Sequence, residues 1–152
     1  MTTMSGPLAE GIRTMDTTTI SIITIDRTQP FDRVKFLGKD WSIDEEDKRS
    51  LALTEVDLTK VLLETTLREE EDFVSDEERL RRLKGAGHIR LDAKVLQTLW
   101  EDWTLIPESW KQKTNGKATH IFFDGTVLRS PPGARYVLSL YWDGLWRWHY
   151  LW

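Results

Sequence analysis

Residues 136–152 read YVLSLYWDGLWRWHYLW, and this stretch decides the fold class. The dipeptide Asp143-Gly144 lies between two apolar and aromatic runs. Asp-Gly favours a two-residue type I′ turn, because both central residues of that turn need positive φ. The stretch therefore predicts a β-hairpin with a two-residue loop, in which Trp142 would face Leu145.

In this predicted register, neither face of the hairpin is polar. One face would carry Tyr136, Leu138, Leu140, Trp142, Leu145, Arg147, His149 and Leu151. The other would carry Arg135, Val137, Ser139, Tyr141, Trp146, Trp148, Tyr150 and Trp152. A large aromatic side chain buries about 150–250 Å², whereas a monomer seldom exposes an apolar patch above about 300–600 Å². The second face therefore needs a cover, either helices of the same chain or a partner.

The composition is that of a soluble globular domain. The chain has 152 residues, of which 39% are hydrophobic and 30% are charged, which indicates one domain with one core. Its net charge of −4 disfavours non-specific binding to DNA or anionic membranes. The absence of cysteine excludes disulfides and cysteine metal sites and fits the reducing cytoplasm. No signal peptide or membrane-spanning run is recognisable, so we expect a cytoplasmic protein.

The N-terminal half gives weaker signals. Residues 1–19 have no periodicity and predict a flexible tail before a single domain over 20–152. The alternating, β-branched residues 20–25 predict a strand. The acidic run at 44–47 is typical of a solvated loop or a first helical turn. For 51–67 both a helix from Thr54 and a strand over 60–67 fit the pattern; we favour the strand, which would pair with 20–25.

Helix signals dominate from about residue 75 to 112. Ser75 and Glu78 have the spacing of a capping box, which predicts a helix of about ten residues ending at Gly85. Asp92 is placed to cap a second helix, whose apolar residues recur at the spacing of one helical face. Pro107 suits the first position of a short third turn.

A β-meander is predicted over about 118–152. Residues 120–123 and 126–129 have strand composition, and Asp124-Gly125 between them is a turn signal. A tight Ser-Pro-Pro-Gly connection at 130–133 then leads into the aromatic hairpin. Together these elements predict an α+β fold: a small antiparallel β-meander with a C-terminal aromatic hairpin, packed on two or three short helices.

The sequence contains partial matches to catalytic motifs, but each lacks a residue or a spacing that the chemistry needs. The sequence FFDGT at 122–126 resembles the first motif of haloacid-dehalogenase-type phosphatases, but Phe122 stands where the nucleophilic aspartate belongs. The three histidines, His88, His120 and His149, lack metal-ligand spacing. We therefore predict no catalytic, cofactor-binding or metal-binding residues and a protein that is not an enzyme.

The surplus of aromatic side chains instead indicates partner binding. Trp, Tyr and Arg dominate the hot spots of protein interfaces. The predicted partner-binding residues are Trp146, Trp148, Tyr150, Trp152, Arg147 and Arg135. The alternative is stacking of single-stranded nucleic acid on the same rings. Recognition of duplex DNA by a helix-turn-helix is less favoured, since the second helix offers only Lys94 and Gln97 as base readers.

Five segments together resemble a group of short uncharacterised bacterial proteins. The segments are LALTEVDL (51–58), IRLDAKV (89–95), LIPESWK (105–111), FDGTVLRS (123–130) and the YWDGxW hairpin. The likeness covers most of residues 20–152 but implies no activity and no site residues. Members of the group continue past the position of Trp152, which favours reading this chain as a fragment that ends within a strand.

Overall fold

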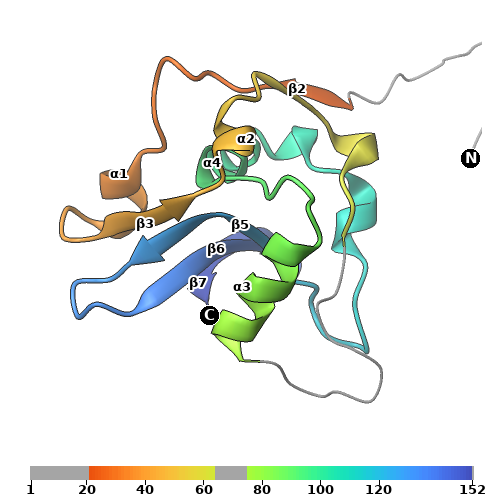
Figure 1. Cartoon of the computed structure of the whole chain (residues 1–152). Helices are drawn as coiled ribbons and strands as arrows, with labels where there is room; N and C mark the ends of the chain where they lie inside the picture. Colours follow the sequence, from red (N-terminus) through yellow and green to blue (C-terminus); the bar gives the residue numbers. More distant parts are fainter. Residues whose placement is uncertain (1–20, 64–74, 152) are drawn as a thin grey trace, which may run out of the picture.

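The computed structural model describes residues 21–63 and 75–151 and has the predicted α+β architecture (Figure 1). The predicted tail at 1–19 lies outside the described residues. In chain order the elements, with η for a 3₁₀ helix, are β2 (Ile22–Thr24), α1 (Arg33–Leu37), β3 (Ser42–Glu46), α2 (Lys48–Leu51), β4 (Glu55–Asp57), η1 (Leu58–Lys60), α3 (Asp76–Gly85), α4 (Ala93–Glu101), η2 (Trp103–Leu105), η3 (Glu108–Lys111), β5 (Ile121–Arg129), β6 (Arg135–Trp142) and β7 (Trp146–Leu151). Among these elements, none of the helices has the length and apolar character needed to cross a bilayer.

A four-stranded antiparallel sheet in the order β3-β5-β6-β7 forms the middle of the molecule (Figure 1). Helix α4 packs on one face, where Leu96 and Leu99 are fully buried against the core. Helix α3 covers part of the opposite face, where Leu80 packs against Val127 and Val137. The sheet therefore separates a large hydrophobic core from a small one.

A short ribbon of β2 and β4 closes the large core on the far side of α4 (Figure 1). Ile23 and Val56 pair across this ribbon and belong to the same core as α4. The predicted strand over 20–25 is thus confirmed in part, as β2. Its partner is β4, not the predicted strand over 60–67. Residues 61–63 form no strand, and 64–67 lie outside the described residues.

The C-terminal hairpin is present, but its loop has three residues instead of two. The prediction that Trp142 faces Leu145 is wrong, since Trp142 pairs with Trp146 and residues 143–145 form the loop. Of these three residues only Gly144 has a positive φ, at 100°, whereas a type I′ turn needs two. The shift by one residue exchanges the two faces of β7.

The observed register makes the hairpin amphipathic. The face toward α4 carries Tyr136, Leu138, Leu140, Trp142, Trp146, Trp148 and Tyr150. The face toward α3 carries Val137, Ser139, Tyr141, Arg147, His149 and Leu151. The prediction that neither face is polar is therefore wrong, and much of the aromatic surplus packs into the chain's own core.

Strand β5 continues through Asp124-Gly125, where the sequence predicted a turn between two strands, although its pairing with β6 is irregular between Phe123 and Leu128. The main-chain N–H of Gly125 donates to the carbonyl of Leu91 at 2.9 Å. A Cβ atom on Gly125 would lie 2.0 Å from the carbonyl oxygen of Arg90. Glycine is required here because another backbone segment crosses the strand at close range, not because the chain turns.

A two-residue turn occurs instead at Asn115-Gly116, in the polar link before β5. Both residues have positive φ, at 53° and 77°. Thr114 and Lys117 exchange both main-chain hydrogen bonds around them, at 2.8 and 3.0 Å. This is the type I′ geometry that the C-terminal hairpin lacks.

Strand β3 is acidic, and the sequence did not predict it. The run at 44–47 was predicted as a loop or a helical turn, yet residues up to Glu46 pair with β5 at the edge of the sheet. Asp47 then caps α2 by accepting a hydrogen bond from the main-chain N–H of Arg49 at 3.0 Å. Ion pairs between neighbouring strands compensate the negative charges of β3. For example, the carboxylate of Asp44 lies 2.9 Å from the guanidinium of Arg129 in β5.

The predicted helix caps are confirmed for α3 and α4, with differences at their ends. Ser75 accepts a hydrogen bond from the main-chain N–H of Glu78, and Asp92 accepts one from Lys94. Gly85 was predicted to end α3 in a left-handed conformation, but the positive φ of 77° belongs to Gly87. Pro107 occupies the capping position of η3 and not its first residue.

Candidate functional site

The sheet separates the six residues predicted to bind a partner. Trp146, Trp148 and Tyr150 lie on the face toward α4, whereas Arg147 and Arg135 belong to the opposite face. The sixth residue, Trp152, lies outside the described residues. The structure thus does not bring the arginines and the rings into one surface.

Two of the aromatic residues are largely committed to the core. Trp146 is only 4% exposed, and its ring meets that of Trp142 edge-on, with centroids 5.4 Å apart. Trp148 is half-buried against Phe36 of α1, with ring centroids 5.1 Å apart. These contacts hold β7 on the core and leave little of Trp146 for a partner.

Tyr150 lies in the exposed part of the aromatic face. It is 36% exposed and packs with the half-buried Trp41 and Tyr136, at ring-centroid distances of 4.9 and 5.2 Å. Trp41 and Tyr136 are themselves 5.5 Å apart. We call Trp41, Tyr136 and Tyr150 the aromatic rim. It borders β7, which is the edge strand of the sheet.

Both predicted arginines are paired with carboxylates. The guanidinium of Arg147 lies 2.8 Å from the carboxylate of Asp143, whose hydrogen bond raises the pKa of Arg147. Arg135 forms ion pairs with three carboxylates, those of Asp44, Glu45 and Glu77. Their charge is therefore largely neutralised within the chain.

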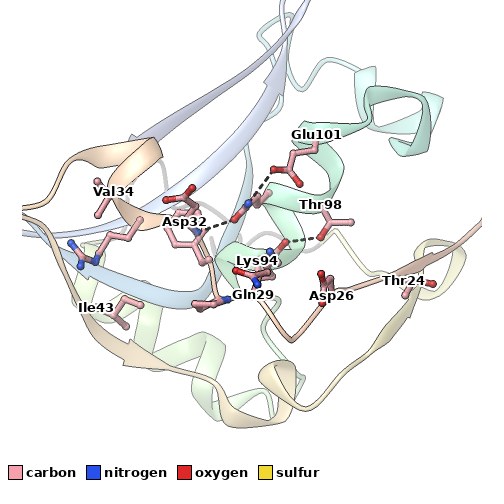
Figure 2. Close-up of a pocket in the computed structure, with 13 residues that line it drawn as sticks. Thr24, Asp26, Gln29, Asp32, Val34, Ile43, Lys94, Thr98 and Glu101 are labelled. Atoms are coloured by element: carbon pink, nitrogen blue, oxygen red, sulfur yellow. Dashed lines mark hydrogen bonds between the residues drawn. The ribbon is translucent and has the colours of Figure 1, made fainter.

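A cleft of about 780 Å³, which the sequence did not predict, lies between α4 and the segment that follows β2 (Figure 2). The α4 side chains in it recur at positions 94, 97, 98 and 101, so they form one face of the helix. The other lining residues are Thr24, Asp26, Gln29, Pro30, Phe31, Asp32, Arg33, Val34 and Ile43. The cleft is thus built by segments about 65 residues apart in sequence.

Hydrogen bonds fix the position of α4 relative to this segment. The side chain of Gln97 accepts from the main-chain N–H of Asp32 at 2.9 Å and donates to the carboxylate of Glu101 at 3.1 Å (Figure 2). Lys94 and Gln97 are only 7% and 6% exposed. These two residues, considered above as base readers, are turned into the protein instead, which disfavours duplex recognition by α4.

The start of α4 is anchored by a buried ion pair. Asp92, 1% exposed, receives two hydrogen bonds from the guanidinium of Arg27, at 2.9 and 3.1 Å, and one from the hydroxyl of Ser50. Burial raises the pKa of Asp92, but together these hydrogen bonds lower it by more than burial raises it. The pKa of Asp92 therefore lies below its usual value. These contacts compensate the buried negative charge of Asp92, so we assign them a structural role and not a catalytic one.

Two further buried carboxylates have opposite pKa shifts. Burial raises the pKa of Asp47, but hydrogen bonds from Arg49 and from the main-chain N–H of Arg90 lower it to about 2. Burial raises the pKa of Asp124 above its usual value, and the nearby Arg90 only partly opposes this. The first group thus stays ionised to lower pH than an exposed aspartate, whereas the second takes up a proton at higher pH than an exposed aspartate.

One serine lies beside a histidine without forming a hydrolytic site. The Oγ atom of Ser139 is 3.4 Å from Nδ1 of His120 and donates to the main-chain carbonyl of His149 at 3.3 Å. Ser139 is fully buried, so a substrate cannot reach it. Burial, with a smaller contribution from His149, lowers the pKa of His120. Over the described ranges, no three His, Asp or Glu side chains converge as metal ligands.

Comparison with known proteins found no matching family, no matching curated protein and no matching solved structure. The resemblance to short bacterial proteins therefore stays a prediction.

Proposed function

We propose that this chain is a non-enzymatic interaction module that binds an extended segment of another protein along β7. Within the described residues, β7 pairs with β6 on one side and with no strand on the other. An edge strand presents a row of main-chain donors and acceptors. Strand addition to such an edge is a common way to bind peptides. This free edge, bordered by the aromatic rim, is the observation that carries the proposal.

The aromatic rim would supply the binding energy. Tyr150 of β7 is 36% exposed, and Trp148 of the same strand is accessible in part. Trp152, which the sequence also predicts to bind the partner, follows β7 in the chain and lies outside the described residues. Trp146 holds the strand in place, while Arg147 and Arg135 lie on the opposite face, already paired with carboxylates, and lie outside the proposed surface. Large rings next to a hydrogen-bonding edge are typical of interface hot spots.

Single-stranded nucleic-acid binding is the alternative function, and the distribution of charge disfavours it. Arg135 and Arg147 already pair with carboxylates, and the net charge of the chain is −4. Nucleic-acid affinity depends mainly on unneutralised cations. This alternative requires quenching of tryptophan fluorescence by oligonucleotides that weakens with added salt; no quenching at low salt rejects it.

A displayed library of random extended peptides tests the main proposal. Peptides selected on the full chain should bind at least about tenfold more weakly to Tyr150→Ala, because an interface ring contributes more than about 1.4 kcal/mol. Arg147→Ala is the matched control on the opposite face and should bind as the wild type does. Hydrogen exchange should slow at the amides of β7. Selected peptides that ignore Tyr150→Ala, or a library without binders, would refute the proposal.

We also propose that the chain acts in the cytoplasm and belongs to the bacterial group described above. The lack of cysteine suits a reducing compartment. Fractionation of bacterial cells that express a natural homologue would test the location.

A further inference from the structure

The two edge strands of the four-stranded sheet differ in how well they are protected against the addition of a further strand. β3 carries three carboxylates, those of Asp44, Glu45 and Glu46, and its register with β5 shifts after Ile43. Charges and irregular pairing of this kind discourage strand addition. β7 pairs with β6 without a shift over its six residues and contains neither an acidic residue nor a proline. Within the described residues, β7 is therefore the less protected edge.

A strand added to β7 would continue the pleat of the sheet, so its side chains would alternate between the two faces. On the face toward α4 they would lie beside the half-buried Trp148 and the exposed Tyr150. Cross-strand pairs between an aromatic ring and another aromatic or β-branched side chain stabilise a sheet. Every second residue of the added strand should therefore be large and apolar, so that it packs on the aromatic rim.

The face of β7 toward α3 has a different character. Its exposed side chains are those of Arg147 and His149. Arg147 pairs with Asp143, which leaves His149 as the exposed polar residue of β7 without an ion pair in the described part of the chain. Basic residues opposite this imidazole would repel its protonated form, whereas acidic or neutral polar residues would not. The intervening residues of the added strand should therefore be polar or acidic, and not basic.

A second copy of the chain fits this requirement poorly. If two β7 strands paired about a two-fold axis with their faces matched, the two registers of greatest overlap would place Arg147 opposite His149, or His149 opposite its own copy. β7 has no carboxylate to compensate these basic side chains. A segment of another protein can supply acidic residues that a second copy lacks.

We infer that the segment bound along β7 belongs to another protein and alternates large apolar residues with polar or acidic ones; this inference rests on the function proposed above. The apolar residues pack on the aromatic rim, and the intervening residues lie on the side of His149. The pattern has a period of two residues. An amphipathic helix bound in a groove would instead present apolar residues every three to four positions.

An alanine scan of a peptide selected on the full chain tests the apolar half of this pattern. Alanine at the rim-facing positions should weaken binding about tenfold, and alanine at the intervening positions less than about twofold, so the losses alternate along the peptide. A peptide of the same composition, with its apolar residues moved to a helical spacing, is the matched control and should bind at least about tenfold more weakly.

His149→Glu tests the other face. A peptide with lysine at the intervening positions should bind this variant about two- to fivefold more tightly than it binds the wild type, because the charge opposite the lysine is reversed. Thr54→Glu is the matched control, since Thr54 is exposed in the loop between α2 and β4 and should leave the affinity unchanged. Melting curves establish that both variants are folded.

Three results would overturn the inference: losses in the alanine scan that do not alternate, an equal affinity of the lysine peptide for His149→Glu and the wild type, or a dimer of the full chain that Tyr150→Ala converts to a monomer. Peptides that need Tyr150 but lack the alternation would refute this inference and leave the binding surface on β7 in place. A library without binders, or binders that ignore Tyr150→Ala, would refute the proposed function and this inference together.

Discussion

The dipeptide Asp-Gly occurs twice in the sheet region, and the structure uses the two copies in opposite ways. Gly125 lies inside β5, where an added Cβ atom would meet the Arg90 carbonyl oxygen at 2.0 Å. Gly144 lies in the loop between β6 and β7, with φ at 100° and no atom within 4 Å of its Cβ position. Glycine is needed for space at the first site and for its backbone conformation at the second.

The two aspartates differ in the same way. Asp124 is 8% exposed, and burial raises its pKa. Asp143 lies at the surface and pairs with Arg147 at 2.8 Å. An identical dipeptide is thus a strand interior in one setting and part of a hairpin loop in the other. The first copy is held by the main-chain carbonyl of Leu91, which accepts from Gly125, and by the guanidinium of Arg90, which donates to the carbonyl of Asp124.

Among substitutions at the two Asp-Gly sites, Gly125→Ala should lower the stability of the protein most. The new methyl group would overlap main-chain atoms, which cannot move aside as a side chain can, so we expect a loss of about 3 kcal/mol or more. Gly85→Ala is the matched control, since Gly85 lies in α3 with open space around it. Chemical denaturation of both variants measures the difference; an equal stability of both would contradict the close approach.

Gly144→Val should destabilise the protein less, by about 1–3 kcal/mol, because it forces a β-branched residue to positive φ without any steric overlap. The neighbouring Leu145→Val places the same side chain at an exposed loop residue without positive φ, and should change stability little. A melting midpoint of Gly144→Val equal to that of the wild type would rule out the observed loop conformation.

Asp124→Asn should stabilise the protein at neutral pH. The folded-state pKa of Asp124 is raised, so its contribution to stability is fully present below the unfolded pKa of about 4 and is lost as pH rises through the folded pKa. Asparagine removes this loss, because it resembles the protonated carboxyl group. Melting midpoints between about pH 3 and pH 8 should diverge from wild type as pH rises; a constant difference would show that burial of the charge is unimportant.

Asp143→Asn should have the smallest effect. The ion pair with Arg147 is exposed and screened by water, and such pairs contribute little. We expect an unchanged melting midpoint at high and low salt. A clear loss at low salt that disappears at high salt would show that the loop depends on this ion pair.

The fold class and the helix starts could be predicted from sequence because their causes are local. Ser75 and Asp92 cap helices through contacts within three residues. The existence of the C-terminal hairpin follows from two strand-forming runs around a turn signal. Its register could not be predicted, because a three-residue loop and a two-residue loop both fit Asp143-Gly144, and packing against Phe36 and Trp41 decides between them.

The remaining features depend on contacts between distant segments. Strand β3 was missed because its acidic residues suit water, and only pairing with β5 and ion pairs such as Asp44 with Arg129 make them a strand. The cleft was missed because Lys94 and Glu101 read as ordinary polar helix residues. The spacing 94, 97, 98 and 101 is a polar helical face, but nothing in it indicates that residues 24–34 would cover it.

The guanidinium of Arg27 joins three parts of the chain: it donates to the carbonyls of Ser50 and Leu53 and to the carboxylate of Asp92. This planar guanidinium therefore fixes the relative positions of these segments, because its donors point in fixed directions and can reach all three acceptors in only one arrangement. The mouth of the cleft comes from the chain just around Arg27, and its back wall starts at Asp92. A shortened protein that begins after Arg27 would keep α4 yet lose the docking of the opposite wall, so this cleft cannot form without the segment around Arg27.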